Sequence, residues 1–150
     1  MPIVLISGGS GLIGTHLSGH LVEKGYEVII LTREKNKVSA NPKISFTYWN
    51  VDKKIIDADI VTKTDHIIHL AGAGVMDKKW TQHYKNIILE SRTKSAEFLI
   101  SCLDRHDDWA AMVCLVGSGQ DLPPGAAGLR DWLAALRQRF DRWQVYLSPR

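Results

Sequence analysis

Short apolar runs alternate with longer amphipathic stretches along this chain. The runs are bounded by glycine, proline or polar residues, as strands buried on both faces of a parallel sheet are. Between them, apolar residues recur at helical spacing. The pattern predicts strands at residues 3–7, 27–32, 44–49, 66–70, 111–116 and 143–147, helices at 11–24, 79–103 and 127–140, and a short helical stretch near 55–61.

This alternation of strands and helices predicts an α/β fold. Parallel strands joined through helices give right-handed crossovers, so that helices cover both faces of the sheet. Six strands fit a doubly wound, Rossmann-like sheet in the order 3-2-1-4-5-6, with three α/β/α layers. We expect residues 1–150 to form one such domain.

A glycine-rich turn, Ser7-Gly8-Gly9-Ser10-Gly11-Leu12-Ile13-Gly14, lies between the first predicted strand and the first predicted helix. In that context, this glycine spacing is typical of a dinucleotide-binding turn. Gly8 permits the tight turn, Gly11 lets the backbone approach a pyrophosphate, and Gly14 lets the helix pack closely. Free N–H groups at the helix start then face the phosphates. We predict cofactor contacts from Gly8, Ser10, Gly11, Leu12, Ile13 and Gly14; the alternative is a structural turn without a ligand.

The residues after the second strand bear on cofactor choice. An acidic residue there would bind the ribose 2′-hydroxyl of NAD, whereas an arginine suits the 2′-phosphate of NADP. The chain has Thr32 followed by Arg33, which favours NADP over NAD, although Glu34 is adjacent. The alternative is that Arg33 is a solvated loop residue.

A second candidate segment follows the fourth strand. Leu70, Ala71 and Gly72 are placed where small residues leave room for a ribose and a nicotinamide. Taken alone, the segment could equally be a turn that ends a strand. We interpret the preceding His69 as a strand histidine with partly satisfied hydrogen bonds rather than as a ligand.

Composition excludes several classes of partner. Nineteen basic residues against 16 acidic ones give a net charge of +3 and no dense basic run, so we expect no nucleic acid. Cys102 and Cys114 lack metal-ligand spacing, and we predict no metal site. No apolar stretch approaches the roughly 20 residues that span a bilayer. We therefore expect a soluble, cytoplasmic monomer that binds a nucleotide and no membrane.

The composition changes near residue 100. All lysines and isoleucines lie at or before that residue, and the later basic residues are arginines only. We interpret the change as a seam between segments of different origin, joined at about residues 100–109. The alternative is uneven sampling within one natural gene.

Residues 1–100 resemble the extended short-chain dehydrogenase/reductase family, in its NADP-binding, epimerase-like branch. The resemblance rests on the glycine turn, on His69-Leu70-Ala71-Gly72, and on Lys79-Trp80-Thr81 followed by Glu90-Ser91-Arg92-Thr93. It implies NADP contacts from the turn, from Arg33 and from residues 70–72.

The family also implies a catalytic serine or threonine after the fifth strand and a Tyr-x-x-x-Lys pair on the next helix. Tyrosine would exchange a proton, and lysine would lower its pKa. No tyrosine of this chain is followed four residues later by lysine. Ser118 follows the fifth predicted strand, but without such a partner we interpret it as a turn residue and predict no catalytic residues.

Residues 109–148 resemble part of a helicase-related P-loop ATPase family. That resemblance would give Gln120, after Gly117-Ser118-Gly119, a nucleotide-sensing role. The chain has no Gly-x-x-x-x-Gly-Lys-Ser/Thr motif to hold ATP phosphates.

These observations lead to one functional hypothesis with two alternatives. The hypothesis is an engineered chimera that keeps an NADP site without catalytic apparatus. The first alternative is a natural, truncated NADP-dependent reductase or epimerase. The second is a scaffold that binds nothing.

Overall fold

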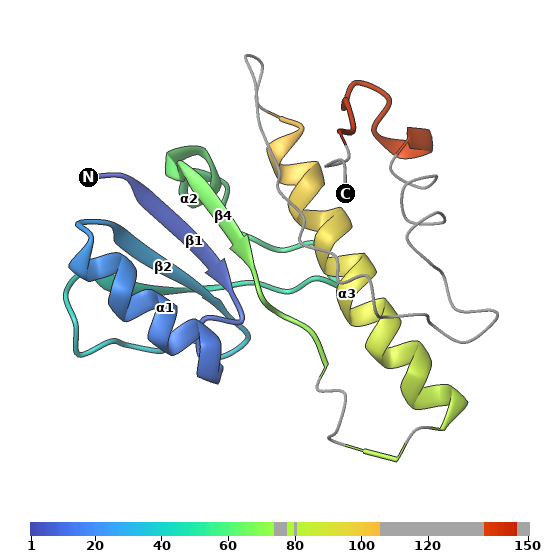
Figure 1. The fold of residues 1–150 in the computed structure, drawn as a ribbon, viewed down its shortest axis with the longest axis horizontal. Helices are drawn as coiled ribbons and strands as arrows, with labels where there is room; N and C mark the ends of the chain where they lie inside the picture. The colour runs from blue at the N-terminus through green and yellow to red at the C-terminus, as the bar shows by residue number, and fades with distance from the viewer. Residues whose placement is uncertain (74–77, 80, 106–136, 147–150) are drawn as a thin grey trace. The chain divides into compact units, whose positions relative to one another are not determined.

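The computed structural model describes residues 1–73, 78–79, 81–105 and 137–146, which are coloured in Figure 1. The chain divides into two compact units, Met1–Leu103 and Asp104–Arg150. In chain order, the described elements of the first unit are β1 (Ile3–Ser7), α1 (Leu12–Glu23), β2 (Glu27–Thr32), β3 (Ile44–Tyr48), α2 (Ala58–Lys63), β4 (His66–His69) and α3 (Gln82–Leu103).

The four strands of this unit form a parallel sheet in the order β3-β2-β1-β4. β1 is central, since Ile6 pairs with Ile30 of β2 on one side and with Ile68 of β4 on the other. From β1, the chain adds β2 and then β3 on one side and returns to add β4 on the other side. The strand order therefore reverses between β1 and β4. In open α/β sheets, ligands bind at the carboxyl edge beside such a reversal.

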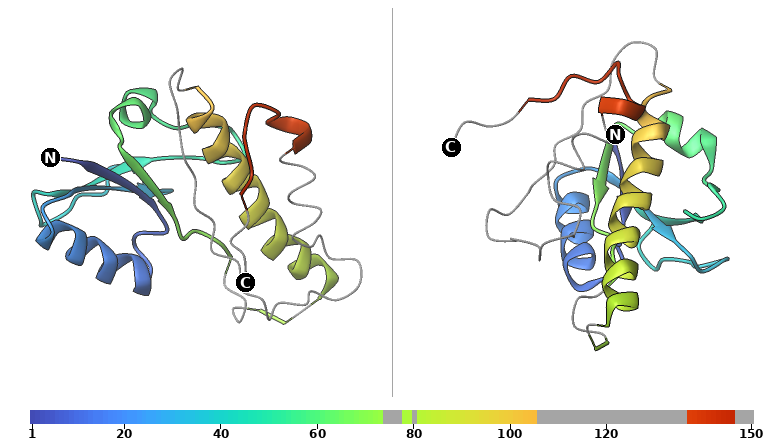
Figure 2. Two further views of the ribbon diagram at one scale, coloured as in Figure 1. Left: turned by 45° about the horizontal axis from the view of Figure 1, so that its top comes forward. Right: turned by 90° about the vertical axis from the view of Figure 1, so that its right-hand side faces the viewer.

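Both faces of the sheet are covered by helices. On one face, Leu21 and Val22 of α1 pack against a buried cluster formed by Val4, Ile6, Val28 and Ile30. On the other face, Leu5, Ile29 and Leu31 lie in a cluster with Val61 of α2 and with Phe98, Leu99 and Cys102 of α3. Figure 2 shows α1 and α3 on opposite sides of the strands. Burial on both faces explains why the strands are continuous apolar runs.

The ends of the shorter helices are set by local hydrogen bonds. Asp57 caps α2, because its carboxylate accepts from the backbone N–H groups of Asp59 and Ile60. Just beyond α1, Gly25 has φ +89°, and its N–H donates to the carbonyl of Val22. A left-handed glycine at this place ends a helix at little cost.

The predicted fold class, a doubly wound parallel α/β sheet, is confirmed in the described residues. β1 and β2 have the predicted bounds, while β3 and β4 each end one residue earlier than predicted. The observed strand order matches the first four positions of the predicted order. The predicted strand at 111–116, Ser118 and Gln120 lie outside the described residues.

The predicted strand at 143–147 is wrong for residues 143–146, none of which is in a strand. Leu147 lies outside the described residues. The indole N–H of Trp143 donates to the Asp104 carboxylate at 2.8 Å, and Arg142 forms an ion pair with the same carboxylate at 3.1 Å. Within the second unit, side-chain bonds rather than a strand ladder thus hold this segment. Of the helix predicted at 127–140, residues 137–139 are described as helical.

Among the described residues, no helix is both long enough and apolar enough to cross a bilayer.

We expect Leu99→Ala to lower the free energy of unfolding by about 2–5 kcal/mol, because Leu99 is fully buried and the truncation leaves a cavity. Ile87→Ala, at a position of the same helix that is 37% exposed, is the matched control. It should cost less than about 1 kcal/mol. Urea unfolding of the full chain measures both, and equal losses would contradict the packing of α3 described above.

Candidate functional site

The glycine turn connects β1 to α1 at the carboxyl edge of the sheet. Gly8 has φ +75°, in the left-handed region that glycine adopts without strain. The carbonyl of Gly8 accepts from the N–H of Gly11 at 3.1 Å, which closes the turn. Gly11 is the N-cap residue of α1. The chain therefore reverses and starts a helix within a few residues.

Three backbone segments meet at this turn without intervening side chains. A Cβ atom on Gly8 would lie 2.8 Å from the backbone nitrogen of Ala71 and from the carbonyl carbon of Leu70. A Cβ atom on Gly14 would lie 2.5 Å from the carbonyl oxygen of Gly8 and from Cα of Gly9. Both distances are too short for any residue with a side chain. The turn, the segment after β4 and the first turn of α1 thus require glycine at positions 8 and 14.

The start of α1 has the properties of an anion-binding end. The first N–H groups of a helix lack intrahelical acceptors, and Gly11 supplies no side-chain cap. The first turn of α1 contains no acidic residue, so the positive end of the helix dipole is not offset there. Ser10 and Gly11 are exposed, and so are the apolar side chains of Leu12 and Ile13, at 82% and 70%. An exposed apolar pair thus lies beside free N–H donors.

The residues predicted to select the cofactor lie at the end of β2, the strand next to β1. Thr32 is buried, and its hydroxyl accepts from the backbone N–H of Glu34 at 3.1 Å. Arg33 and Glu34 are exposed. The Glu34 carboxylate forms an ion pair with Lys37 at 3.3 Å.

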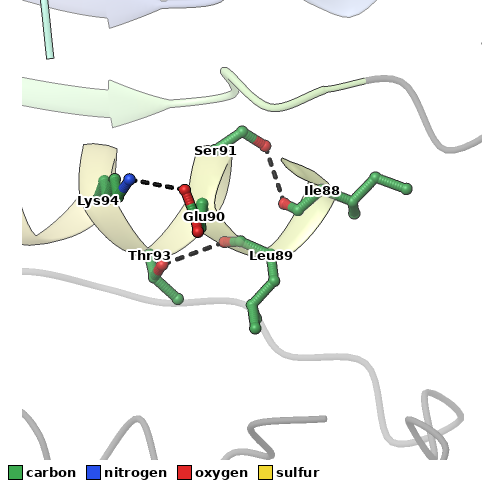
Figure 3. Close-up of polar contacts among 6 residues, drawn as sticks. All are labelled: Ile88, Leu89, Glu90, Ser91, Thr93 and Lys94. Atoms are coloured by element: carbon green, nitrogen blue, oxygen red, sulfur yellow. Dashed lines mark hydrogen bonds and ion pairs between the residues drawn. The ribbon is translucent and has the colours of Figure 1, made fainter. Parts of the chain in front are cut away.

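The segment after β4 is held from both sides. On the β1 side, the N–H of Leu70 donates to the carbonyl of Ser7 at 2.9 Å. On the α3 side, the N–H of Ala73 donates to the Ser91 hydroxyl at 2.9 Å, and Arg92 donates to the carbonyl of Ala73 at 3.2 Å. The same Ser91 hydroxyl donates to the carbonyl of Ile88, one of the bonds along α3 drawn in Figure 3. Residues 70–73 are therefore positioned by α3 as well as by the sheet.

His69 joins β1, β4 and α3 through a chain of polar contacts. Its Nδ1 lies 2.5 Å from the Ser7 hydroxyl, and its Nε2 lies 2.9 Å from the Ser95 hydroxyl. The Ser95 hydroxyl donates to the carbonyl of Ser91 at 2.6 Å, so its hydrogen is not available to the ring. Nε2 therefore carries the ring hydrogen, and Nδ1 accepts from Ser7. Both ring nitrogens have a partner, which is more than the partly satisfied strand histidine that the sequence predicted.

Burial lowers the pKa of His69 below its ordinary value of 6.5, and the nearby positive charge of Arg92 lowers it further. The neutral ring is thus the form that fits between Ser7 and Ser95.

The structure brings some predicted site residues together and leaves others apart. The turn and residues 70–71 are in direct contact, while Thr32 and Arg33 lie one strand away, beyond the end of β2. That these residues hold a dinucleotide stays a prediction. The sequence did not predict that Ser91 and Arg92 hold the segment after β4, or that Ser95 contacts His69. The family resemblance did, however, rest in part on Glu90-Ser91-Arg92-Thr93 of α3.

We expect Gly14→Ala to destabilise the chain by several kcal/mol, because its methyl group would overlap the Gly8–Gly9 backbone. The matched control is Gly19→Ala on the same helix, where a Cβ atom meets nothing within 4 Å. Alanine there should be neutral or stabilising, by up to about 1 kcal/mol. Chemical denaturation measures both, and a harmless Gly14→Ala would contradict the close approach.

We expect the free energy of unfolding to fall as the pH drops below 6.5. The unfolded chain then takes up a proton at residue 69, whereas the folded chain resists protonation until a lower pH because its pKa is lowered. The stabilisation is complete above 6.5 and is lost between 6.5 and the lower folded-state pKa. Denaturation of His69→Gln across this range should show a shallower pH dependence than the unsubstituted chain. His66→Gln, at an exposed position of the same strand, is the control; an unchanged slope in His69→Gln would refute the assignment.

Curated proteins similar to this chain come from staphylococci. An epimerase family protein of Staphylococcus haemolyticus is 35% identical over 110 residues, which are 71% of this chain and 34% of that protein. An epimerase family protein of Staphylococcus saprophyticus is 39% identical over 102 residues, covering 66% of this chain and 32% of that protein. The chain thus spans about a third of the length of these relatives.

Solved structures with the same fold include proteins with different cofactors. The human epimerase family protein SDR39U1, determined with NADPH, matches with a TM-score of 0.52 and 22% identity over 70% of this chain and 32% of that one. A UDP-glucuronic acid 4-epimerase from Bacillus cereus, determined with UDP-glucuronic acid and NAD, matches with a TM-score of 0.56 and 16% identity. That match covers 69% of this chain and 37% of the other. At these identities the likeness shows the fold.

The comparisons overturn the hypothesis of an engineered chimera. The match to one family runs from residue 4 to residue 126, across the expected seam at residues 100–109 and into the segment expected to derive from a P-loop ATPase. No finding supports a helicase-related fragment at residues 109–148. The composition break was a poor guide because exchanging lysine for arginine at exposed positions changes folding stability little. Such a change in residue usage therefore need not mark a joint.

The family whose sequence model matches residues 4–126 is described as the NAD dependent epimerase/dehydratase family. The match includes the glycine turn, β2, β3, β4 and α3, and all of β1 except Ile3. The chain belongs to this NAD dependent epimerase/dehydratase family.

Proposed function

We propose that this chain binds NADP(H) at the carboxyl edge of β1, β2 and β4. The observation that carries the proposal is the side-chain-free junction of the glycine turn with α1. Gly8 and Gly14 set the turn, and the start of α1 presents N–H groups with no cap and no acidic residue. A pyrophosphate satisfies those donors and interacts favourably with the helix dipole.

The surroundings of the turn suit the rest of a dinucleotide. Leu12 and Ile13 offer exposed apolar contacts beside the proposed pyrophosphate position. On the other side, the segment Leu70-Ala71-Gly72 contributes backbone atoms and the small residues Ala71 and Gly72, and Ser91 and Arg92 fix its end. Sites for cofactors commonly combine such apolar walls with a few placed polar groups.

The proposal favours NADP over NAD because Arg33 follows β2. A guanidinium at this place can pair with a 2′-phosphate. The fold alone does not decide the choice, since the human protein was determined with NADPH and the Bacillus cereus enzyme with NAD.

Family membership favours a second proposal, that the natural protein is an NADP-dependent reductase or epimerase. Bound NADP(H) would supply hydride transfer, and the residues named above would bind and orient it. A proton donor would also be needed. No residue is assigned to this role, because the chain lacks the Tyr-x-x-x-Lys spacing. Action as a cytoplasmic monomer stays a prediction.

We expect Gly11→Ala to weaken binding of both NADPH and NADH by about tenfold or more, because a methyl group there obstructs the approach of the pyrophosphate. Folding should persist. Gly11 has φ −77°, which alanine adopts readily, and the nearest atom to an added Cβ is the Gly8 oxygen at 3.3 Å. Fluorescence titration of the full chain measures both affinities.

Gly19→Ala is the matched control and should bind both cofactors as the unsubstituted chain does. The proposal is wrong if the unsubstituted chain binds neither cofactor, or if Gly11→Ala binds both unchanged.

A further inference from the structure

Two histidines lie one helical turn apart on α1. His16 and His20 are the ends of the segment His16-Leu17-Ser18-Gly19-His20, and residues at this spacing share one face of a helix. Both histidines are exposed, while the buried residues of α1 are Gly14 and Ser18. The pair therefore lies on the side of α1 that faces away from the sheet.

Each of the two rings has its Nδ1 atom directed at an oxygen atom. Nδ1 of His16 lies 3.1 Å from the carbonyl oxygen of Leu12, and because a carbonyl oxygen only accepts, this nitrogen carries a hydrogen. Nδ1 of His20 lies 3.6 Å from a carboxylate oxygen of Glu23, whose negative charge favours a hydrogen on that nitrogen. Among the described residues, no group bonds to Nε2 of either ring. The neutral rings thus present two free Nε2 lone pairs on one face of α1.

Metal-ligating histidines have this arrangement. A ligating ring almost always donates its other N–H to a backbone carbonyl, a carboxylate or water, which fixes the tautomer and the orientation of the ring. On α1, the carbonyl of Leu12 and the carboxylate of Glu23 are acceptors of these two kinds. Helical zinc sites also use two histidines four positions apart on one face. The spacing and the tautomers of the pair therefore indicate the same role.

We propose that His16 and His20 chelate one divalent transition-metal ion through their Nε2 atoms. Imidazole nitrogen suits Cu²⁺, Ni²⁺ and Zn²⁺, whereas Mg²⁺ and Ca²⁺ prefer oxygen ligands. Across the part of the chain that the structure describes, no group of three histidine, cysteine or acidic side chains is placed to hold a metal ion. The pair is therefore a two-ligand site, and water or an incoming donor fills the other coordination positions.

This inference goes beyond the proposed function, since it does not involve the cofactor. It also departs from the sequence prediction of no metal site, which rested on the spacing of the cysteines.

Calorimetric titration of the full chain, without an affinity tag, tests the proposal with Cu²⁺, Zn²⁺ and Mg²⁺. Cu²⁺ should bind more tightly than Zn²⁺, and Mg²⁺ should show no such binding. His16→Gln and His20→Gln should each weaken Zn²⁺ binding about tenfold or more, because a single imidazole cannot chelate. The matched control is His83→Gln, which removes an exposed histidine of α3 that has no other histidine one turn away. It should leave the affinity unchanged.

Nitrogen NMR of the histidine rings identifies the ligating atoms. Zn²⁺ should shift the Nε2 resonances of His16 and His20 together. The proposal is overturned if only one of these rings responds, or if His83→Gln weakens binding as much as His16→Gln does, since the histidines then bind metal independently. Unchanged Zn²⁺ affinity in both His16→Gln and His20→Gln equally refutes it. Without metal, the variants should unfold at the temperature of the unsubstituted chain, because all three positions are exposed.

Discussion

The backbone of the glycine turn lies very near the backbones on either side of it, and this close approach constrains the carboxyl edge of the sheet. Gly8 lies so near Leu70 and Ala71, and Gly14 so near Gly8 itself, that a single methyl group at either position would overlap main-chain atoms. Main-chain atoms cannot move aside as the end of a flexible side chain can. The position of α1 over the sheet is therefore tied to the position of the segment after β4. The same contact places the start of α1 at this edge.

A series of hydrogen bonds among side chains positions the segment after β4, which is the other side of that close approach. Ser7 is the last residue of β1, His69 is the last residue of β4, and Ser95 belongs to α3. The hydrogen bonds among them cross from the sheet to the helix inside the unit, where a missing partner would be costly. Ser91 and Arg92, one turn earlier on α3, bind the backbone of Ala73. The next helix along the chain thus sets where residues 70–73 lie.

Much of the first unit could be predicted from sequence because its determinants are local. β1 and β2 are apolar on both faces and are bounded by proline, glycine or polar residues, so their bounds follow directly. The requirement for glycine at position 8 follows from residue type and context, since a strand must turn at once into a helix. The local pattern failed at residues 143–146, part of the strand predicted at 143–147. A strand needs a neighbouring backbone, and Trp143 instead bonds through its side chain to Asp104, which no local pattern encodes.

The pairing of Glu34 with Lys37, and the partners of His69, likewise could not be read from sequence. A stretch such as Arg33-Glu34-Lys35-Asn36-Lys37 shows three cations and one carboxylate, but not which cation is neutralised. That depends on the left-handed turn at Asn36 and on where the rings of β3 lie. His69 contacts residues 62 and 26 positions away, so its neutral state is a property of the folded arrangement.

Cofactor choice in this fold is a matter of loop charge rather than of sheet geometry. Structures that share the fold with this chain at TM-scores of 0.52 and 0.56 were determined with NADPH and with NAD, respectively. The strands and the glycine turn present the same kind of edge to the pyrophosphate, which both cofactors contain. What distinguishes the cofactors is a phosphate on one ribose, and the binding energy for that group must come from charges placed beside it. In this chain, Arg33, Lys35 and Lys37 lie on the loop after β2, outside the strand ladders. The choice of cofactor can therefore change while the turn, the sheet and α1 stay as they are.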